Sequence, residues 1–444
     1  MPTPRAAKPE ARRKLATDTR ETIFALSSGS PPCGVAVIRV SGPRAGLALE
    51  TLTGSLPEAR RASVRQVVDP QNGWLDEALV LWMPGPRSAT GEDCAEIHCH
   101  GGRAVIHAIE AALEGSCGLV RAEAGEFTRR AFQNGRMDLL EAEALGDMLS
   151  AETELQRAVL AHSAGGHASA AVARWRDAVL AASAAVEQEL DFSDEDEEGV
   201  APPAVWRGEL LGVVDEMHTW LAAPSADKLR EGLRIVLAGP PNSGKSSLFN
   251  AILDEAAAIV SPIAGTTRDA IERPIALGGV PFLLVDTAGL RGDSADEIEQ
   301  IGISRAQEEL ARADIVLWLG PEGEGPEGAL EVSSMVDLPD GPRKSGDALQ
   351  VSSLTRQGLH ELIEAIADAG RDRLPRPGQA AVSRRQRQYL AEAGQAIASA
   401  IEERDPLLAG ETLRQARHAM DRMLGNVATE DMLDALFGRF CIGK

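Results

Sequence analysis

The chain has 444 residues, which suggests about three domains at roughly 150 residues for each. Hydrophobic residues make up 44% of it and charged residues 25%, values typical of globular proteins, so disorder is not expected over most of the chain. The formal net charge of -22 argues against an extended basic surface that coats nucleic acid, so an RNA partner has to meet local basic patches.

The cysteines and the first residues indicate the compartment. Five cysteines, odd in number and scattered, argue against a disulfide framework and predict a cytoplasmic protein: Cys33, Cys94, Cys99, Cys117 and Cys441. The first 20 residues are basic without an apolar segment, and no later run approaches about 18 uncharged apolar residues, so neither secretion nor membrane spanning is predicted. An Arg-rich start also occurs in mitochondrial transit peptides, but Glu10, Asp18 and two early prolines favour a disordered tail over 1–20.

The first third of the chain alternates short apolar runs with turn residues. Residues 34–42, 77–86 and 94–102 are predicted to form strands, and Ile106 to Leu113 a short helix. An α+β domain is therefore expected over about 20–135.

From about Leu139 the sequence is rich in Ala, Glu and Leu, and apolar residues recur at helical spacing. The acidic run 191–198, expected to be a solvated loop, and Pro202–Pro203 interrupt this pattern before another helix. The two predicted helical faces comprise Val172, Trp175, Val179, Ala182, Val186 and Leu190, and then Leu210, Val213, Val214, Met217 and Leu221.

An α/β region interrupts these helices. Leu233–Ala238 and Val280–Val285 are predicted as buried strands, and alternating strands and helices from about 230 to 370 indicate a parallel sheet covered on both faces. After Pro375–Pro377 the helical pattern returns. The α/β domain is therefore expected to be inserted into a helical one.

A phosphate-binding loop opens this inserted region. Residues 239–246, GPPNSGKS, fit the pattern G-x-x-x-x-G-K-[ST] between a predicted strand and a predicted helix. Backbone N–H groups of such a loop hold phosphate at the helix N-terminus, while Lys245 reaches the β and γ oxygens and Ser246 can bind Mg²⁺.

Two further motifs follow in the order typical of GTPases. The segment SPIAGTTRD (261–269) offers Thr266 and Thr267 to Mg²⁺ and the γ-phosphate. Asp286 of DTAGL ends the next strand, where its carboxylate can bind a water of the metal and the Gly289 N–H can meet the γ-phosphate. The three motifs together predict a GTPase-type domain.

The usual water-orienting glutamine is missing. Its position is occupied by Leu290, whose side chain cannot hydrogen-bond, so catalytic help has to come from elsewhere. Asn242 is a candidate ligand for a monovalent cation, and Glu299 in DEIEQIG (296–302) is a candidate to orient water, although an exposed helical charge is the alternative for Glu299.

The guanine-binding motif N-K-x-D is altered. Asp337 is present, but Ser334 and Met335 stand where Asn and Lys are expected, which predicts weaker guanine affinity or selectivity. The segment VSSLT (351–355) fits the last base-contacting loop.

Several motifs together closely resemble the tRNA uridine-modification GTPase family, called MnmE or TrmE. The likeness runs from about residue 21 to 444. Beside the GTPase motifs, it is carried by TGEDCAEIHCHGG (90–102), GEFTRRAFQNGRMDLLEAEAL (125–145) and the terminal FCIGK (440–444).

The resemblance implies a folate-binding N-terminal domain followed by a helical domain that the GTPase domain interrupts. The implied layout is a tail at 1–20, a folate-binding and dimerisation domain at 21–136, helical parts at 137–229 and 374–444, and the GTPase domain at 230–373. It also implies a homodimer that works with the FAD-dependent partner MnmG, in a heterotetramer or larger complex, to add an aminomethyl or carboxymethylaminomethyl group to C5 of the wobble uridine of tRNA.

The implied cofactors are GTP, Mg²⁺, K⁺ and a reduced folate, either 5,10-methylene- or 5-formyl-tetrahydrofolate. Folate contacts fall on Arg39, Glu96, Lys444 and Arg136, the last being usually Lys, so that charge is kept but geometry changes. K⁺ ligands fall on Asn242, Ser261, Ile263 and Thr266, Mg²⁺ ligands on Ser246 and Thr267, and catalytic roles on Glu299, Lys245 and Thr267. The remaining GTP contacts are Ser243, Gly244, Ser247, Asp286, Thr287, Ala288, Gly289, Asp337, Ser352 and Ser353.

Two features leave alternatives open. Cys441 is a candidate nucleophile if the tail reaches the folate site, whereas a free cysteine is more often a small buried hydrophobe. The triplet His98–Cys99–His100 suggests metal, but on a strand both histidines face away from the cysteine, which favours core packing or lining of the folate pocket.

Competing functions also differ in sequence. A ribosome-assembly GTPase should carry an RNA-binding module such as a GXXG-bearing domain, and none is evident. A scaffold that binds nucleotide poorly is suggested only by the altered guanine motif. The GEFT block and the CIGK tail favour the modification enzyme.

Overall fold

The computed structural model describes residues 21–192, 205–259, 272–286, 307–339, 341 and 343–444. The chain divides into two compact units, Met1–Ala142 with Ala428–Lys444, and Glu143–Val427. The expected tail over 1–20 and nearly all of the acidic run lie outside the described residues. No described helix is long and apolar enough to cross a membrane.

A mixed sheet forms the centre of the first unit. Its strand order is β3-β4-β5-β2-β1-β6, antiparallel throughout except for the parallel pair β1 and β6. The strands are β1 (Ile23–Leu26), β2 (Cys33–Ser41), β3 (Ser63–Asp69), β4 (Gly73–Met83), β5 (Cys94–Gly101) and β6 (Val120–Arg121). The strands expected at 34–42, 77–86 and 94–102 are therefore confirmed.

One face of this sheet is buried under α1 (Ala45–Thr53) and α2 (Arg103–Gly115). Alternate residues of the strands point into this core because side chains on a strand alternate between the two faces. The core includes Phe24, Ile38, Val40, Leu49, Val80, Ile97, Ile109 and Leu113.

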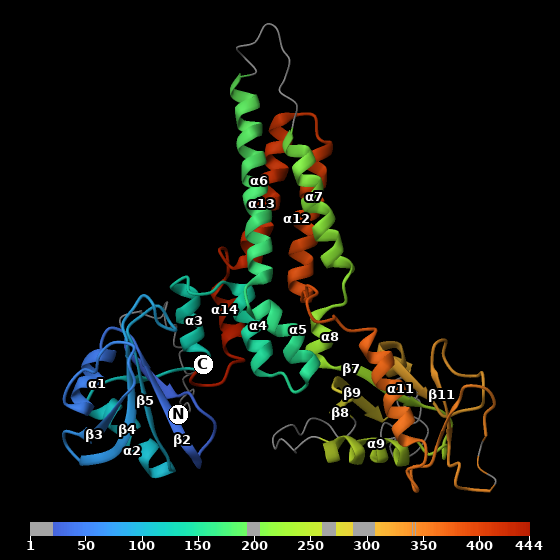
Figure 1. Ribbon diagram of the computed structural model, residues 1–444. Coiled ribbons are helices and arrows are strands. Elements are labelled where there is room, and N and C mark those ends of the chain that lie inside the picture. Colours follow the sequence, from blue (N-terminus) through green and yellow to red (C-terminus); the bar gives the residue numbers. More distant parts are fainter. Residues whose placement is uncertain (1–20, 193–204, 260–271, 287–306, 340, 342) are drawn as a thin grey trace, which may run out of the picture. The chain divides into compact units, whose positions relative to one another are not determined.

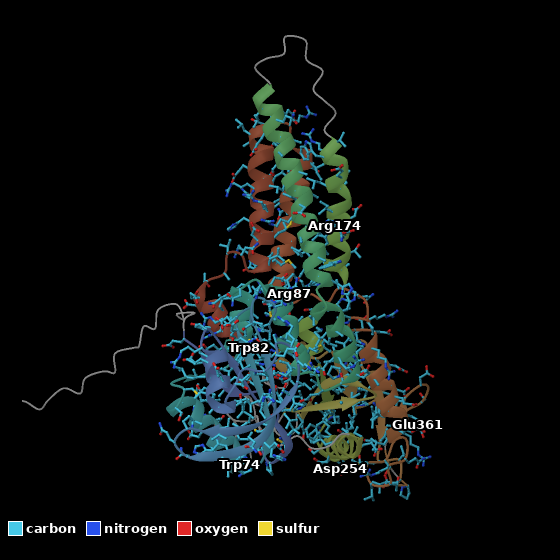
Figure 2. The ribbon with its side chains drawn as sticks, turned by 60° about the vertical axis from the view of Figure 1, so that its left-hand side comes forward. Trp74, Trp82, Arg87, Arg174, Asp254 and Glu361 are labelled. Carbon is cyan, nitrogen blue, oxygen red and sulfur yellow. The ribbon has the colours of Figure 1, made fainter. Side chains whose placement is uncertain are left out.

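The other face of the sheet is only partly covered. Register places Glu96 of β5 between Arg39 of β2 and Leu81 of β4, and His98 between Val37 and Leu79, all of them half-buried. The two tryptophans of β4 differ in burial (Figure 2). Trp82 packs against α1 in the core, whereas Trp74 near the start of the strand is 64% exposed.

The C-terminal segment completes the first unit. Helices α3 (Glu126–Gln133) and α14 (Glu430–Phe437) pack together, and Arg129 forms ion pairs with Glu430 and Asp434. The family resemblance places residues 428–444 with the helical domain, but here they pack with the N-terminal unit because α14 buries Leu433 and Phe437 beside α3.

Four long helices of the second unit lie side by side as a bundle (Figure 1). They are α6 (His167–Phe192), α7 (Val205–Ala222), α12 (Arg384–Glu402) and α13 (Pro406–Leu424), with the shorter α5 (Glu154–Ala164) and α8 (Ala226–Glu231). Helix α4 (Leu139–Leu149) begins in the first unit and ends in the second. Of the residues expected at helical spacing, Val172, Trp175, Val179, Ala182, Val186, Leu210, Val213, Val214 and Met217 are buried.

The second unit also contains a sheet with the order β12-β11-β10-β7-β9-β8. Its elements are β7 (Leu233–Ala238), α9 (Lys245–Ile259), β8 (Glu272–Leu277), β9 (Val280–Asp286), β10 (Ile315–Trp318), β11 (Leu330–Ser334), β12 (Leu349–Val351) and α11 (Leu359–Arg371). The strands are parallel except for β8, which is antiparallel to β9. The expectation of a purely parallel sheet misses this hairpin, because Gly278 and Gly279 both have positive φ and join the two strands directly.

Candidate functional site

The phosphate loop joins β7 to α9 in the second unit. Gly239 has φ 148°, and a Cβ there would lie 3.0 Å from the backbone nitrogen of Gly320. Gly244 (φ 88°) and Asn242 (φ 61°) also adopt positive φ, so the loop turns tightly before the helix begins at Lys245. This is the strand, loop and helix context that the motif requires.

Lys245 and Ser246 occupy the start of α9. The Lys245 ammonium donates to the carbonyl oxygens of Gly239 (3.0 Å) and Pro240 (2.7 Å), so its charge is held inside the loop. The Ser246 hydroxyl donates to Asp286 Oδ2 at 3.1 Å, which brings together two oxygen ligands predicted to hold or surround Mg²⁺. A cavity of about 860 Å³ opens here and is lined by these loop residues with Ser247, Trp318 and Met335.

The loop that follows β11 is tied to the phosphate loop. The buried Ser334 hydroxyl donates to the carbonyl oxygen of Ser243 at 2.7 Å. Met335 has φ 57°, and its Cε would lie 3.0 Å from a Cβ on Gly244. Asp337 is exposed, as a base-contacting carboxylate requires. The altered motif therefore retains a direct link between base loop and phosphate loop.

The last predicted base loop follows β12. Ser352 is fully buried, and its hydroxyl accepts a hydrogen bond from the Thr355 backbone at 3.0 Å, while Ser353 is half-buried. Several predicted residues lie outside the described residues: Ser261, Ile263, Thr266, Thr267, Thr287, Ala288, Gly289, Leu290 and Glu299.

In the first unit, two predicted folate contacts form an ion pair on adjacent strands. Arg39 donates from Nε (3.0 Å) and Nη2 (2.9 Å) to Glu96 Oε1, and Glu96 Oε2 lies 3.1 Å from His98 Nε2. Burial raises the pKa of the Glu96 carboxyl, but the His98 hydrogen bond and the Arg39 cation outweigh it, so the pKa lies below its usual value. The Arg39 guanidinium also lies 5.8 Å from the ring centroid of Phe127 on α3.

The C-terminal tail lies against β1. The Ser27 hydroxyl donates to the Gly443 carbonyl at 2.8 Å, and Gly443 has φ 94°, where a Cβ would lie 2.1 Å from the Leu26 carbonyl oxygen. Ile442 pairs with Ala124 in an isolated bridge. The tail is therefore held by its backbone, and glycine is required at the point of closest approach.

The docked tail carries two predicted site residues, Lys444 and Cys441. Lys444 donates its backbone N–H to the Cys441 carbonyl at 3.2 Å and is half-buried. Cys441 is exposed, so the alternative of a buried hydrophobe does not hold for it. The remaining predicted folate contact, Arg136, follows the last residue of α3. Its Cγ lies 3.2 Å from where a Cβ on Gly91 would be.

The His98–Cys99–His100 triplet has the alternation expected of a strand. Cys99 is buried, and burial raises the pKa of its thiol to about 11. His98 pairs with Glu96, and the exposed His100 lies 2.8 Å from Asp76. The two histidines thus have different carboxylate partners, and no group of three metal ligands occurs in the described part of the chain.

Arg130 is buried and doubly ion-paired, and it is not among the site residues predicted from the sequence. Its side chain is 3% exposed and forms ion pairs with Glu92 at 3.0 Å and with Glu126 at 2.8 Å. All three residues belong to the TGEDC and GEFTRR motifs, so those motifs contained the signal. A buried arginine has no pattern of its own, however, and Arg129 beside it looks the same in the sequence.

Comparisons with known proteins agree with these motifs. Residues 22–136 match the family model for the N-terminus of the GTP-binding protein TrmE, and residues 139–441 match the model for the MnmE helical domain. The tRNA modification GTPase MnmE of Erythrobacter litoralis (strain HTCC2594) is 57% identical, covering 96% of this chain and 100% of that protein. The protein of the same name from Novosphingobium aromaticivorans is 52% identical, with the same coverage. Because these matches extend over nearly the whole chain, it belongs to the MnmE family of tRNA modification GTPases and is itself a GTPase that acts in tRNA modification.

Proposed function

We propose that this GTPase, together with a flavoprotein partner of the MnmG type, adds an aminomethyl or carboxymethylaminomethyl group to C5 of the wobble uridine of certain tRNAs. A reduced folate bound to the first unit supplies the one-carbon group. GTP hydrolysis in the second unit drives a conformational step. We place the activity in the cytoplasm, which the free cysteines favour.

The docked tail is the observation that carries the folate proposal. The short segment 124–127 contacts both the tail and Arg39. Ala124 pairs with Ile442 of the tail, and the Phe127 ring lies beside the Arg39 guanidinium. We therefore propose that the end of the chain, with Lys444, reaches the Arg39–Glu96 pair. The Arg39 guanidinium and the Glu96 carboxylate on the half-buried sheet face, together with the proposed contact Lys444 in the tail, suit a ligand that carries carboxylates and a polar ring edge.

The nucleotide site is proposed to use Mg²⁺ through Ser246 and Thr267. Ser246 and Asp286 fit this proposal because their oxygen atoms already lie within hydrogen-bond distance of each other. When bound, Mg²⁺ neutralises charge on the phosphate oxygens. Lys245 is positioned at the loop to exchange its carbonyl partners for phosphate oxygens.

We also propose a K⁺ site at Asn242. Asn242 is exposed, adopts a positive φ and lines the same cavity as Lys245. The other proposed ligands, Ser261, Ile263 and Thr266, lie outside the described residues. When bound, K⁺ supplies a positive charge to the transition state, which compensates for the Leu290 substitution.

A homodimer is proposed through the first unit. Its sheet leaves apolar side chains exposed that a second copy would cover, namely Val35 (59%), Val64 (60%) and Trp74 (64%). Dimerisation here leaves the second unit free to bind the flavoprotein partner and tRNA.

Deleting Lys444 tests the folate proposal. We expect 5-formyl-tetrahydrofolate to bind at least about tenfold more weakly, because one charge-assisted hydrogen bond to the ligand is lost. The measurement is a calorimetric titration of the full chain, with GTP hydrolysis as a control that the second unit is intact. An unchanged dissociation constant would remove the tail from the site.

A further inference from the structure

Two motifs of this chain meet at one buried arginine that the proposed ligand contacts do not use. Arg130 lies in the middle of α3, in GEFTRR, and its guanidinium faces the loop that carries TGEDC. Only 3% of its side chain is exposed. A fully charged group in that position needs an explanation, because burying a charge is costly unless it is paired.

The guanidinium joins three separate segments. Nη1 donates to Glu92 Oε2 (3.0 Å) and to the backbone carbonyl of Glu21 (2.8 Å), and Nη2 donates to Glu126 Oε1 (2.8 Å). Glu92 Oε2 also accepts from the Ser41 hydroxyl on β2 at 2.8 Å. The network therefore fastens the loop and α3 to the same strand of the sheet.

Stability alone does not account for these charges. A buried ion pair is often matched or exceeded in stability by apolar residues of similar volume. Arg130 Nε is buried without a partner among the described residues, so its desolvation is not fully compensated. The planar guanidinium of Arg130 instead fixes the positions of the Glu92 and Glu126 carboxylates relative to each other.

Arg130 fixes the position of α3 relative to the loop 90–93, and both segments border the proposed folate site. Asn134, one turn after Arg130, donates to the Thr90 carbonyl at 2.8 Å. A Cβ on Gly91 would lie 2.8 Å from Asn134 Cβ and 3.2 Å from Arg136 Cγ, so loop and helix end are in close contact. Phe127 lies one turn before Arg130, over Arg39. Phe127 in α3 and Arg136 just beyond its last residue are therefore both tied to the orientation of this helix.

We propose that Arg130 is a positioning residue for the folate site. Its ion pairs with Glu92 and Glu126 hold α3 and the loop 90–93 so that Arg136 and Phe127 stand at fixed distances from the Arg39–Glu96 pair. Arg130 itself does not contact the ligand. This inference rests on the proposed binding of reduced folate to the first unit.

The test compares 5-formyl-tetrahydrofolate binding by the full chain and by Arg130→Met, Arg130→Lys and Glu92→Gln. We expect Arg130→Met to weaken binding at least about tenfold and Arg130→Lys to recover part of it, because lysine keeps the charge but loses the fork. Glu92→Gln keeps the shape of the loop, so it tests the ion pair if Arg130→Met does not fold. Arg61→Met is the matched control, since its pair with Glu58 is exposed.

A double variant separates positioning from general destabilisation. If Arg130 acts by positioning Arg136 and Phe127, then Arg130→Met combined with Arg136→Met loses less affinity than the product of the two single losses. Losses that multiply, or wild-type affinity in folded Arg130→Met and Glu92→Gln, overturn the inference. If the wild-type chain itself does not bind the folate, the proposed function fails first, and that result is distinguishable from both.

Discussion

The two units place their proposed chemistry on different parts of a sheet. In the first unit, Arg39 and Glu96 extend from adjacent strands of a sheet with one partly open face. In the second, Lys245, Ser246 and Asp286 lie at the ends of strands, where loops and a helix begin. Strand-borne groups are held by the register of their strands, whereas loop-borne groups are held by the turn that carries them and can exchange their present partners for bound ions and nucleotide.

The dependence of GTP hydrolysis on the monovalent cation should be the strongest difference between the two proposed sites. We expect GTP hydrolysis in KCl to exceed that in NaCl on the order of 100-fold, because the smaller, more strongly hydrated Na⁺ does not fill a site sized for K⁺ and the charge that stabilises the transition state is then lost. Asn242→Ala should remove the difference, while Glu299→Ala should abolish turnover in both salts. The measurement is steady-state hydrolysis at matched ionic strength, with ATP as the control for guanine selection.

Folate binding to the first unit should not respond to this exchange of salts. Equal hydrolysis rates in KCl and NaCl would contradict the cation proposal. Equal turnover of ATP and GTP would indicate that Asp337 alone does not select guanine.

A smaller effect is expected where two loops of the second unit support each other. Ser334→Ala removes the hydrogen bond to the Ser243 carbonyl and leaves that buried acceptor unpaired, which costs about 1–3 kcal/mol. GDP should therefore bind about tenfold more weakly, which corresponds to about 1.4 kcal/mol. The measurement is a titration with a fluorescent GDP analogue.

Ser333→Ala is the matched control for this link. Ser333 is the neighbouring buried serine on β11, and its hydroxyl accepts a hydrogen bond from the Lys344 backbone N–H. If both variants lose affinity equally, the effect belongs to the strand and not to the connection between the loops.

The two sites were predictable from sequence to different degrees for a physical reason. A phosphate loop is contiguous, so residues 239–246 state both its shape and its chemistry. The first unit joins residues far apart in the chain, such as Ser27 with Gly443, and periodicity contains no such information. Arg129 and Arg130 make the point most directly, because these adjacent arginines pair with different segments, Arg129 with α14 and Arg130 with the loop at Glu92, and only the structure separates them.

The smallest expected effect concerns the strand-borne pair itself. Since the pKa of Glu96 lies below its usual 4.5 in the folded chain, its ionised form contributes stability that is present above that value and lost as pH falls through the folded pKa. Glu96→Gln should therefore lower the stability of the first unit by about 1 kcal/mol near neutral pH, since the pair with Arg39 is partly solvated.

This difference between the wild type and Glu96→Gln should shrink as the pH is lowered below 4.5. The measurement is thermal unfolding of both chains across that range, at two salt concentrations. A difference that stays constant with pH would mean that glutamate is favoured at this position for its shape rather than its charge. The geometry of the strand-borne site would then come from strand register and packing rather than from the ion pair. Arg39 would be held by its contact with Phe127 and by the pairing of β2 with β5.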